Sequence, residues 1–367
     1  MTAILLIVDF SKAFDSIHRE TMLLILEAYG IPKNLVQSIG ALYANTTSTV
    51  RTPDGDTDFF EVLAGVLQGD TLAPYLFVIV LDYVLRTSID ENSQLGFTLQ
   101  SRRSRRHPAT TMTDADFADD LALLADNSND AEKLLILLEE AAEAVGLRVN
   151  YGKTNFMAFL ESGSSVKGKS GDELEAVSDF KYLGSWLASS STDMKIRIAQ
   201  AWGAHNKLDK IWKSTLKRDM KIRLFQSLVL SILLYGAETW TLTKTLQKKL
   251  DGVFTRMLRK TLGLTWRDKV SNTNLYGNIP TLSSELRQRR LRFAGHCWRR
   301  KEEICSELLM WEPAHGKRKR GAPARTYIDL LKEDTGMEKE DLPNLMGDRV
   351  LWRSYVDGIR GLRPRQK

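Results

Sequence analysis

Residues 114–125, Asp-Ala-Asp-Phe-Ala-Asp-Asp-Leu-Ala-Leu-Leu-Ala, decide how the rest of the chain is interpreted. Two adjacent carboxylates, Asp119 and Asp120, lie between apolar residues on both sides. Because neighbouring side chains of a strand point to opposite faces, the continuous apolar run indicates a strand buried on both faces. Acids at the end of such a strand are costly to desolvate unless they lie in a turn or hold a cation. Since Asp is common in turns, this stretch by itself leaves a plain strand–turn–strand and a metal site equally open.

Length, composition and charge limit the classes of protein to which the chain can belong. At 367 residues it is long enough for two or three domains, and 43% hydrophobic with 27% charged residues is typical of soluble globular proteins. The net charge of +6 permits a polyanionic partner without requiring one. No signal peptide is expected, and the apolar run at 224–235 is interrupted and too short to span a bilayer. We therefore expect a soluble protein without a membrane partner.

Apolar periodicity predicts a first half of mixed α and β structure. Residues 3–8 form a continuous apolar run, which predicts a buried strand ending at Asp9. Residues 65–70 are expected to form a flexible loop, and residues 180–187 a strand pair that turns at Gly184. The other elements expected here are helices at 18–30, 32–44, 71–86 and 131–145 and strands at 46–50, 59–63 and 155–159.

From about Asp193 the pattern becomes helical. Helices are predicted near 219–235 and 243–263, and a basic helix at 285–301. Across 281–325, 12 Lys or Arg stand against 5 Asp or Glu, so this segment alone can account for the positive balance of the chain. We expect three regions: an α+β region at 1–190, a helical region at 191–275 and a basic helical region at 276–367.

Asp9 and the pair Asp119–Asp120 each lie where an apolar strand meets a turn. The intervening elements can bring both strand ends together on one antiparallel sheet. Three converging carboxylates would form an oxygen-only site suited to Mg²⁺ or Mn²⁺. Two such ions can clamp the attacking and leaving oxygens of an in-line phosphoryl transfer. Neither a histidine nor a cysteine is among these residues, which argues against zinc.

Five segments follow one another along the chain: Val8–Asp15, Gly65–Phe77, Phe117–Asp120, Gly146–Thr154 and Tyr182–Gly184. In this order they resemble the five palm motifs of the reverse transcriptases of non-LTR retrotransposons, most closely those of the RTE-type clade. Each motif is weak by itself, whereas all five at the family's approximate spacings are specific. The resemblance continues through Leu233–Trp240, Gly295–Arg300 and Gly316–Gly321, and so covers essentially the whole chain. It implies an α+β palm, an antiparallel sheet with helices, followed by a helical thumb and a basic helical C-terminal domain.

The resemblance implies catalytic roles for four side chains. Asp9, Asp119 and Asp120 resemble the family's catalytic triad, which would hold two Mg²⁺ ions, or Mn²⁺, with the backbone carbonyl of Phe10 as a further ligand. Asp9 and Asp119 are expected to contribute most. Lys153 falls at the position proposed to protonate the pyrophosphate leaving group as a general acid.

Other matching residues imply contacts with an RNA template, a DNA primer and deoxynucleoside triphosphates. Phe14 occupies the steric-gate position, where an aromatic ring crowds the sugar 2′ carbon and disfavours ribonucleotides. Gln68 and Gly69 would let the chain approach the incoming nucleotide and template closely. Taken singly, Phe14 fits a core residue, Lys153 a surface lysine and Gln68-Gly69 any turn. The residues expected to hold the primer end are Tyr182, Leu183 and Gly184.

Basic residues near the C-terminus predict contact with nucleic-acid phosphates, which would make binding salt-dependent. A solvated face or a nuclear import signal would explain the same runs, and the resemblance implies a protein of the nucleus and cytoplasm. The residues concerned are Arg299, Arg300, Lys317, Arg318, Lys319 and Arg320.

The two cysteines, Cys297 and Cys305, provide no disulfide framework, which suits a reducing compartment. With His296 and His315 they invite a zinc-knuckle interpretation, but their spacing matches no compact knuckle. We expect Cys297 to pack on a helix instead.

The chain also departs from the family. A fingers domain before the first palm motif and an N-terminal endonuclease are expected to be lacking, because Met1 lies only eight residues before Asp9. Ala73 stands where serine is common, and Ala322-Pro323 where Arg-Pro is common. The expected function is an RNA-directed DNA polymerase fragment of a non-LTR retrotransposon. The alternative is a decayed, non-catalytic nucleic-acid-binding remnant. A nucleotide cyclase palm is less well supported, because Gln68-Gly69 and Phe14 fit a templated polymerase better.

Overall fold

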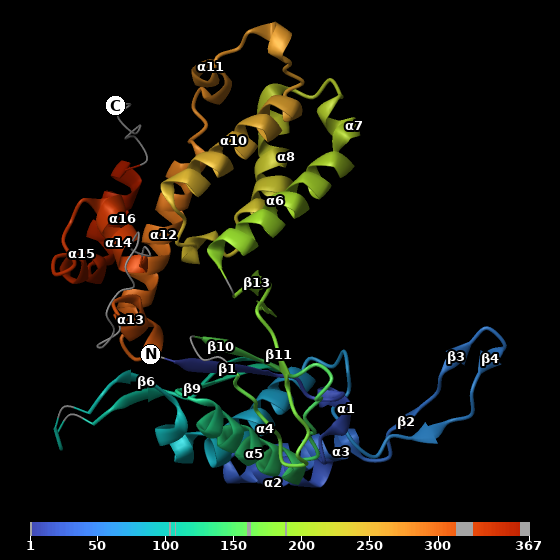
Figure 1. Cartoon of the computed structure of the whole chain (residues 1–367). Helices are drawn as coiled ribbons and strands as arrows, with labels where there is room; N and C mark the ends of the chain where they lie inside the picture. Colours follow the sequence, from blue (N-terminus) through green and yellow to red (C-terminus); the bar gives the residue numbers. More distant parts are fainter. Residues whose placement is uncertain are drawn as a thin grey trace. The chain divides into compact units, whose positions relative to one another are not determined.

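The computed structural model describes residues 2–102, 104–106, 108–159, 163–187, 189–312 and 326–359. Within these ranges the chain divides into two compact units, residues 2–178 and residues 179–312 with 326–359 (Figure 1). Among the described residues, no helix combines the length and apolar character that a bilayer span requires.

The first unit is an α+β arrangement, as predicted. Its strands are β1 (Ala3–Val8), β2 (Thr47–Ser48), β3 (Arg51–Thr52), β4 (Gly55–Asp56), β5 (Phe60–Glu61), β6 (Phe97–Gln100), β7 (Thr110–Met112), β8 (Asp114–Phe117), β9 (Asp120–Ala125), β10 (Asn155–Phe159) and β11 (Glu175–Ala176). Its helices are α1 (Ala13–Ser16), α2 (Arg19–Ala28), α3 (Lys33–Tyr43), α4 (Ala73–Ser88), η1 (Asp90–Leu95) and α5 (Ser128–Ala144).

The main sheet is built around β1, in the order β11-β10-β1-β9-β8. β1 pairs antiparallel with both β9 and β10, which confirms the predicted antiparallel sheet. Alternate residues of β1, namely Ile4, Leu6 and Val8, are buried in the core that α4 and α5 share with this face of the sheet (Figure 1). Burying each such side chain contributes about 1.5–3 kcal/mol, so this face fixes the position of the strand.

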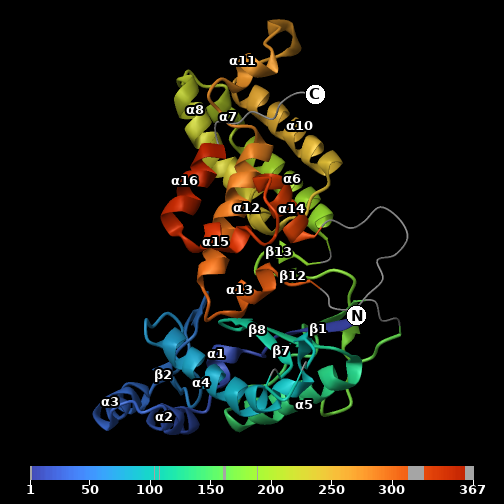
Figure 2. The same cartoon turned by 90° about the vertical axis from the view of Figure 1, so that its left-hand side faces the viewer.

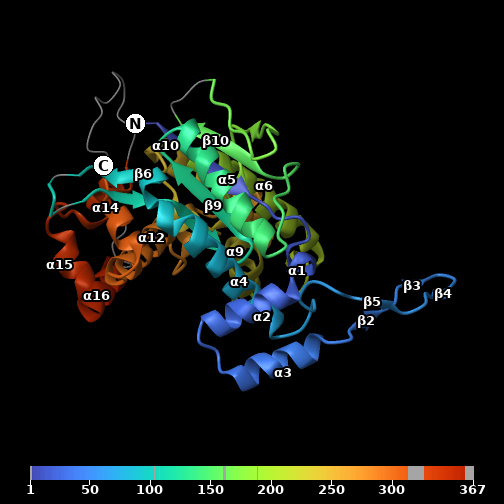
Figure 3. The same cartoon turned by 90° about the horizontal axis from the view of Figure 1, so that it is seen from below.

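A narrow arm formed by β2, β3, β4 and β5 extends from the α2–α3 pair and away from the sheet (Figure 3). The predicted hairpin turn at 53–56 is confirmed, because Arg51 pairs with Asp56. The flanking strands, predicted at 46–50 and 59–63, are only two residues long each. Their side chains are largely exposed, and Phe59 is 77% exposed. A longer ladder has no buried face to stabilise it here.

Capping residues explain why two helices begin earlier than predicted. α5 starts at Ser128 rather than at 131, because the Asn127 side chain accepts a hydrogen bond from the Asp130 amide at 3.0 Å. α12 starts at Leu282 rather than at 285, with Thr281 as its cap. Polar first turns carry no apolar periodicity, so the pattern alone misses them.

The second unit is helical apart from one hairpin. That hairpin consists of β12 (Lys181–Tyr182) and β13 (Ser185–Trp186). The helices are α6 (Ser190–Lys207), α7 (Asp209–Trp212), α8 (Arg218–Phe225), η2 (Gln226–Leu230), α9 (Ser231–Leu233), η3 (Ala237–Thr239), α10 (Lys244–Thr261), η4 (Trp266–Asp268), α11 (Asn272–Tyr276), α12 (Leu282–Arg299), α13 (Ile304–Leu309), α14 (Tyr327–Thr335), α15 (Leu342–Gly347) and α16 (Arg349–Ile359).

The helix α12 connects two hydrophobic cores of this unit. Leu282 and Leu286 belong to the core formed with α6, α8 and α10, whereas Leu291 and Ala294 belong to a second core. In that second core, α14, α15 and α16 gather around α12 (Figure 2). Cys297 is buried in this core, which confirms the expected helix-packing role.

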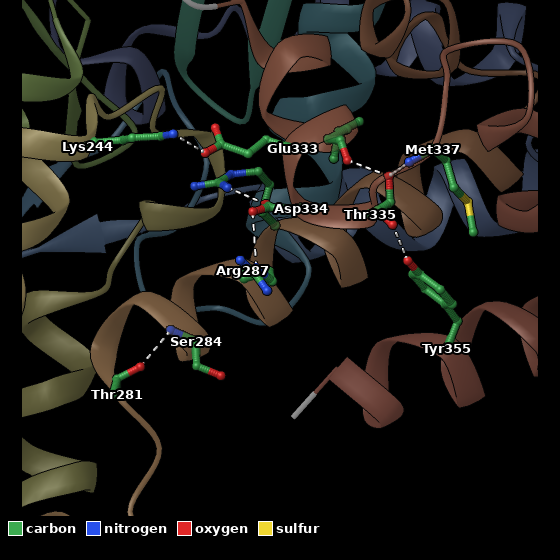
Figure 4. A network of polar contacts seen from close by, with 11 residues as sticks. Lys244, Thr281, Ser284, Arg287, Glu333, Asp334, Thr335, Met337 and Tyr355 are labelled. Carbon is green, nitrogen blue, oxygen red and sulfur yellow. Dashed lines mark hydrogen bonds and ion pairs between the residues drawn. The ribbon is translucent and has the colours of Figure 1, made fainter. Parts of the chain in front are cut away.

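A polar network ties α14 to its neighbours (Figure 4). Asp334 pairs with Arg290, which is 1% exposed, and also with Arg287 at 3.3 Å. On the exposed side of α14, Glu333 pairs with Lys244 of α10 at 3.3 Å. The Arg290 guanidinium therefore has its charge balanced inside the protein, whereas the Lys244–Glu333 pair is largely hydrated.

Asp334→Ala is expected to lower the free energy of unfolding by about 3–5 kcal/mol, because it leaves the Arg290 charge buried without a carboxylate. Glu333→Ala, at the adjacent position, is the matched control and should cost at most about 1 kcal/mol. Urea unfolding of the two variants measures both values. Equal losses would contradict the assignment of Asp334 as the counter-charge of Arg290.

Candidate active site

Strand register places the predicted carboxylates together. The β1–β9 ladder pairs Val8 with Leu121, so the next opposed positions are Asp9 and Asp120. The β8–β9 ladder closes with Phe117 opposite Asp120, which leaves Ala118 and Asp119 as the tip of the hairpin. Ala118 has φ 57°, a left-handed conformation that costs a non-glycine residue about 1–2 kcal/mol. The predicted strand–turn–strand is therefore observed, and its turn brings the acidic pair beside Asp9.

The electrostatics of this cluster are those of like charges close together at the end of the hairpin, where Asp119 and Asp120 are exposed. The pKa of Asp120 is raised, first by burial and then by the negative charges of Asp119 and Asp9. Within the described ranges, no three acidic, histidine or cysteine side chains converge as a ready-made metal site. The donors nevertheless fit a hard divalent cation, because they are all carboxylate oxygens whose mutual repulsion a cation would relieve.

The fourth motif, Gly146–Thr154, forms hydrogen bonds with the backbone of Asp9 and places Lys153 beside the Asp9 side chain. The Asn150 amide donates to the Asp9 carbonyl at 2.8 Å, and the Asp9 amide donates to the Thr154 hydroxyl at 3.2 Å. A turn closed by the Lys153 amide and the Asn150 carbonyl then brings the Lys153 Nζ to 3.8 Å from Asp9 Oδ2. The Lys153 side chain is 68% exposed, so it can exchange this carboxylate for another partner.

The residues that follow Asp9 are fixed by the same segment. Phe10 is bridged to Val149, with hydrogen bonds from the Asn150 amide to the Asp9 carbonyl and from the Ser11 amide to the Arg148 carbonyl. These two bonds leave the carbonyl of Phe10, the predicted backbone ligand, outside the bridge.

Phe14 is half-buried and stacks on the buried ring of Phe77, with ring centroids 4.7 Å apart and planes 13° from parallel. This packing is the one expected of a core residue, and it also fixes the direction of the ring at the position predicted to be the steric gate. Phe77 belongs to α4 and to the second motif, so two motifs meet at this pair of rings.

The loop of the second motif is docked on the first motif by its backbone. The Gly65 amide donates to the Ile17 carbonyl at 2.8 Å, and the Val66 amide to the Phe14 carbonyl at 2.7 Å. A β carbon at Gly65 would lie 2.6 Å from the Cα of Asp15, so only glycine fits there. The predicted nucleotide contacts, Gln68 and Gly69, lie at the exposed end of this loop. There the side-chain Nε2 of Gln68 donates to the Asp15 carboxylate at 3.0 Å.

Arg19 secures the other side of this loop, and the sequence contained no signal for that role. Its guanidinium donates to the backbone carbonyls of Gly65 at 2.9 Å, Tyr43 at 2.9 Å and Val62 at 2.6 Å. These acceptors come from three separate segments. Arg19 therefore joins α2, α3, the arm and the second motif.

The predicted primer-holding residues form the tip of the β12–β13 hairpin in the second unit. Leu183 and Gly184 both have positive φ, 46° and 83°, as a two-residue hairpin turn requires. The Tyr235 hydroxyl donates to the Leu183 carbonyl at 3.0 Å, and the Arg197 guanidinium donates to the Gly184 carbonyl. Arg197 also stacks over the Tyr235 ring, 4.4 Å from its centroid. Both carbonyls of the tip are thus held by one stacked pair of side chains.

A buried aspartate supports this stacked pair. Asp193, which is 2% exposed, lies 3.5 Å from the Arg197 Nε and accepts hydrogen bonds from the Trp240 indole at 2.8 Å and from the Trp186 amide at 3.4 Å. Tyr235 and Trp240 both belong to the segment Leu233–Trp240, which stood out in the sequence without an assigned role. The structure shows that this segment packs against the hairpin.

The predicted basic residues that the structure describes have partners in the protein. Arg299 is half-buried and donates to the Met346 carbonyl at 3.0 Å, while Arg300 pairs with Glu303 at 2.5 Å. Lys317, Arg318, Lys319 and Arg320 lie outside the described residues, as does His315. Burial raises the pKa of the Cys297 thiol to about 11, which disfavours the thiolate that zinc requires.

Comparison with known proteins agrees with this architecture. The reverse transcriptase (RNA-dependent DNA polymerase) family matches residues 1–187. This range contains all five motifs and about half of the chain. The chain therefore belongs to the reverse transcriptase family.

Several relatives are transposon proteins. The chain is 29% identical over 237 residues to an uncharacterised transposon-derived protein of Caenorhabditis elegans, covering 61% of this chain and 85% of that protein. It is 26% identical to the Pol polyprotein of the R2DM element of Drosophila melanogaster, covering 70% of this chain and 24% of the polyprotein. It is 28% identical to an R2 Pol polyprotein of Popillia japonica, covering 69% and 41%. The chain thus spans less than half the length of these two polyproteins.

Among solved structures, the telomerase of Candida tropicalis, in complex with a fragment of telomeric RNA, matches with a TM-score of 0.37 and 14% identity. The match covers 84% of this chain and 49% of the telomerase chain.

Two glycines of the second motif provide a stability test of the docked loop. Gly65→Ala is expected to cost on the order of 3 kcal/mol, because it combines a positive φ with a clash against the Asp15 backbone. Gly69→Ala is the matched control: it also has a positive φ, but its new β carbon meets open space, so about 1 kcal/mol is expected. Urea unfolding measures both, and similar losses would show that the close approach at Gly65 is unimportant.

Proposed function

We propose that the chain carries the polymerase site of a non-LTR retrotransposon reverse transcriptase, which extends a DNA primer on an RNA template. The observation that carries this proposal is the strand register that sets Asp9 against Asp120, with Lys153 Nζ 3.8 Å from Asp9. The family membership supports RNA-directed synthesis over other reactions of clustered carboxylates.

Two Mg²⁺ ions, or Mn²⁺, held by Asp9, Asp119, Asp120 and the Phe10 carbonyl would stabilise the charge on the attacking and leaving oxygens. Residues around the carboxylates fix their positions before a metal ion or substrate binds. The hydrogen bonds from Asn150 and to Thr154 fix the backbone of Asp9, so its carboxylate is oriented before substrate binds. Lys153 lies beside Asp9, and its proposed role is to give a proton to the pyrophosphate oxygen that leaves.

Selection of the sugar is assigned to Phe14. Stacking on Phe77 holds the ring at a fixed angle, so a 2′-hydroxyl at that place cannot displace it cheaply. Gln68 and Gly69, exposed at the end of the docked loop, are proposed to contact the base pair that forms. The hairpin tip at Tyr182, Leu183 and Gly184 is proposed to hold the primer end, with Tyr235 and Arg197 keeping the tip in shape.

The finer assignments belong to the same proposal. Placement in the RTE-type clade rests on the five palm motifs, whereas relatives of the chain include elements of the R2 type. We also propose a palm at 1–190, a thumb-like region at 191–275 and a basic region at 276–367. Action in the nucleus and cytoplasm is proposed from the family resemblance.

Asp119→Ala is expected to reduce primer extension by about 10³-fold or more, because it removes a carboxylate on which the charge balance of the transition state depends. Asp116→Ala, on the same hairpin, is the matched control and should extend nearly as well as the wild type. The measurement is extension of a labelled DNA primer on an RNA template with deoxynucleotides and Mg²⁺. If Asp119→Ala extends as well as Asp116→Ala, the site assignment is wrong.

Salt-sensitive RNA binding without extension by the wild type would favour the alternative, a non-catalytic nucleic-acid-binding protein.

Phe14→Ala is expected to let the enzyme incorporate ribonucleotides, since the space beside the sugar 2′ carbon would open. Phe77→Leu is a useful companion, because it keeps the Phe14 ring and removes only its stacking partner, so a smaller change is expected. Single-nucleotide incorporation with matched deoxy- and ribonucleotides measures the ratio. Unchanged sugar selectivity in Phe14→Ala would refute the gate.

A further inference from the structure

Two basic stripes face one cleft in the second unit. On α12, Arg292, His296 and Arg299 are spaced by four and three residues, and therefore lie on one face of the helix. On α16, Arg349 and Arg353 are spaced by four, beside Trp352, Val356 and Asp357. These eight residues line a single cleft of about 470 Å³.

The floor of the cleft is rigid. The indole of Trp352 is buried and donates to the Leu291 carbonyl at 2.8 Å. A β carbon at Gly295 would lie 2.2 Å from the Trp352 Nε1, so glycine at this position lets α16 pack directly against α12. The motif segment Gly295–Arg300, which the sequence placed in a basic helix, thus sets the distance between the two basic stripes.

The charge of the cleft is only partly balanced by the protein. Four arginines face one carboxylate among the lining residues, which leaves three positive charges in excess with His296 neutral. Asp357 is shared between Arg292 at 3.1 Å and Arg353 at 3.9 Å. Arg299 is held by the Met346 carbonyl, and its pKa is lowered by burial and then by the nearby charge of Arg349. Within the described residues, no carboxylate lies within ion-pair distance of Arg349.

We propose that this cleft binds the phosphodiester groups of a nucleic-acid strand. Guanidinium groups match phosphate oxygens geometrically, and several of them held in advance lose little entropy on binding. A bound phosphate would also relieve the repulsion between Arg299 and Arg349. Nucleic acid is the favoured source of phosphate because the inference rests on the proposed template-copying function.

The test uses the full chain and a fluorescein-labelled single-stranded RNA, with affinity measured by anisotropy over a series of salt concentrations. The double variant Arg349→Gln with Arg353→Gln is expected to bind about tenfold more weakly, with a salt slope smaller by about 1.4, since each phosphate contact on a single strand contributes about 0.7. Lys207→Gln with Lys210→Gln, two exposed lysines on α6 and α7 outside the cleft, removes the same charge and serves as control. Equal weakening in the two double variants would overturn the proposal.

Two further measurements keep the outcome clear. Arg349→Lys with Arg353→Lys keeps both charges and should recover most of the salt slope, which a damaged fold would not allow. The second measurement is the thermal unfolding midpoint with added inorganic phosphate. If phosphate raises the midpoint of the wild type but not of the Gln double variant, and both proteins bind RNA equally well, the cleft binds free phosphate. That result would overturn the proposal that it binds a nucleic-acid strand.

The proposed polymerase function can fail independently of the cleft. RNA binding is measured without DNA synthesis. If the chain binds RNA through Arg349 and Arg353 but does not extend primers, the proposed role of the cleft stands and the proposed polymerase function is wrong. If the chain extends primers and the Gln double variant binds RNA as tightly as the wild type, only the proposed role of the cleft is wrong.

Discussion

The antiparallel pairing of β1 with both β9 and β10 is the constraint on which the first unit depends. A slip of one residue in either ladder would turn Ile4, Leu6 and Val8 away from the core, so burial of these side chains fixes the register. The same register sets Asp9 opposite Asp120. The carboxylates therefore repel one another at a place that the hydrophobic core enforces, and the core provides the free energy that holds them there.

Much of the first unit could be predicted from local patterns. The strand ending at Asp9, the acidic hairpin and the helix α4 all have signals within a few residues of the feature itself, and the same holds for the turn at Gly184 in the second unit. The strand order β11-β10-β1-β9-β8 was not predicted, because periodicity does not state which strands pair. The short lengths of β2 and β5 could not be predicted, since the apolar residues of the segments predicted as strands, such as Val50, Phe59 and Leu63, remain exposed in the folded chain.

Other residues of the site had no signal because their partners gather only on folding. Arg19 is bound by carbonyls from three distant segments, none of which marks an arginine in advance. Asp193 appeared in the sequence only as the approximate start of the helical region. In the structure it is buried with an arginine, an indole and a backbone amide, which together replace the water that the carboxylate loses. The partners in such a network meet only in the folded chain. Motif spacing describes order along the chain and therefore does not reveal them.

The attachment of the β12–β13 hairpin to Tyr235 and Arg197 has a practical consequence for how the protein is divided. The match to the reverse transcriptase family ends at residue 187, whereas the second compact unit begins at Asp179. A fragment trimmed at the similarity boundary would retain the hairpin and discard the side chains that hold its two tip carbonyls. A boundary chosen by homology would thus separate one folded element from its own supports. Cutting before Asp179 would keep each element with the side chains that shape it.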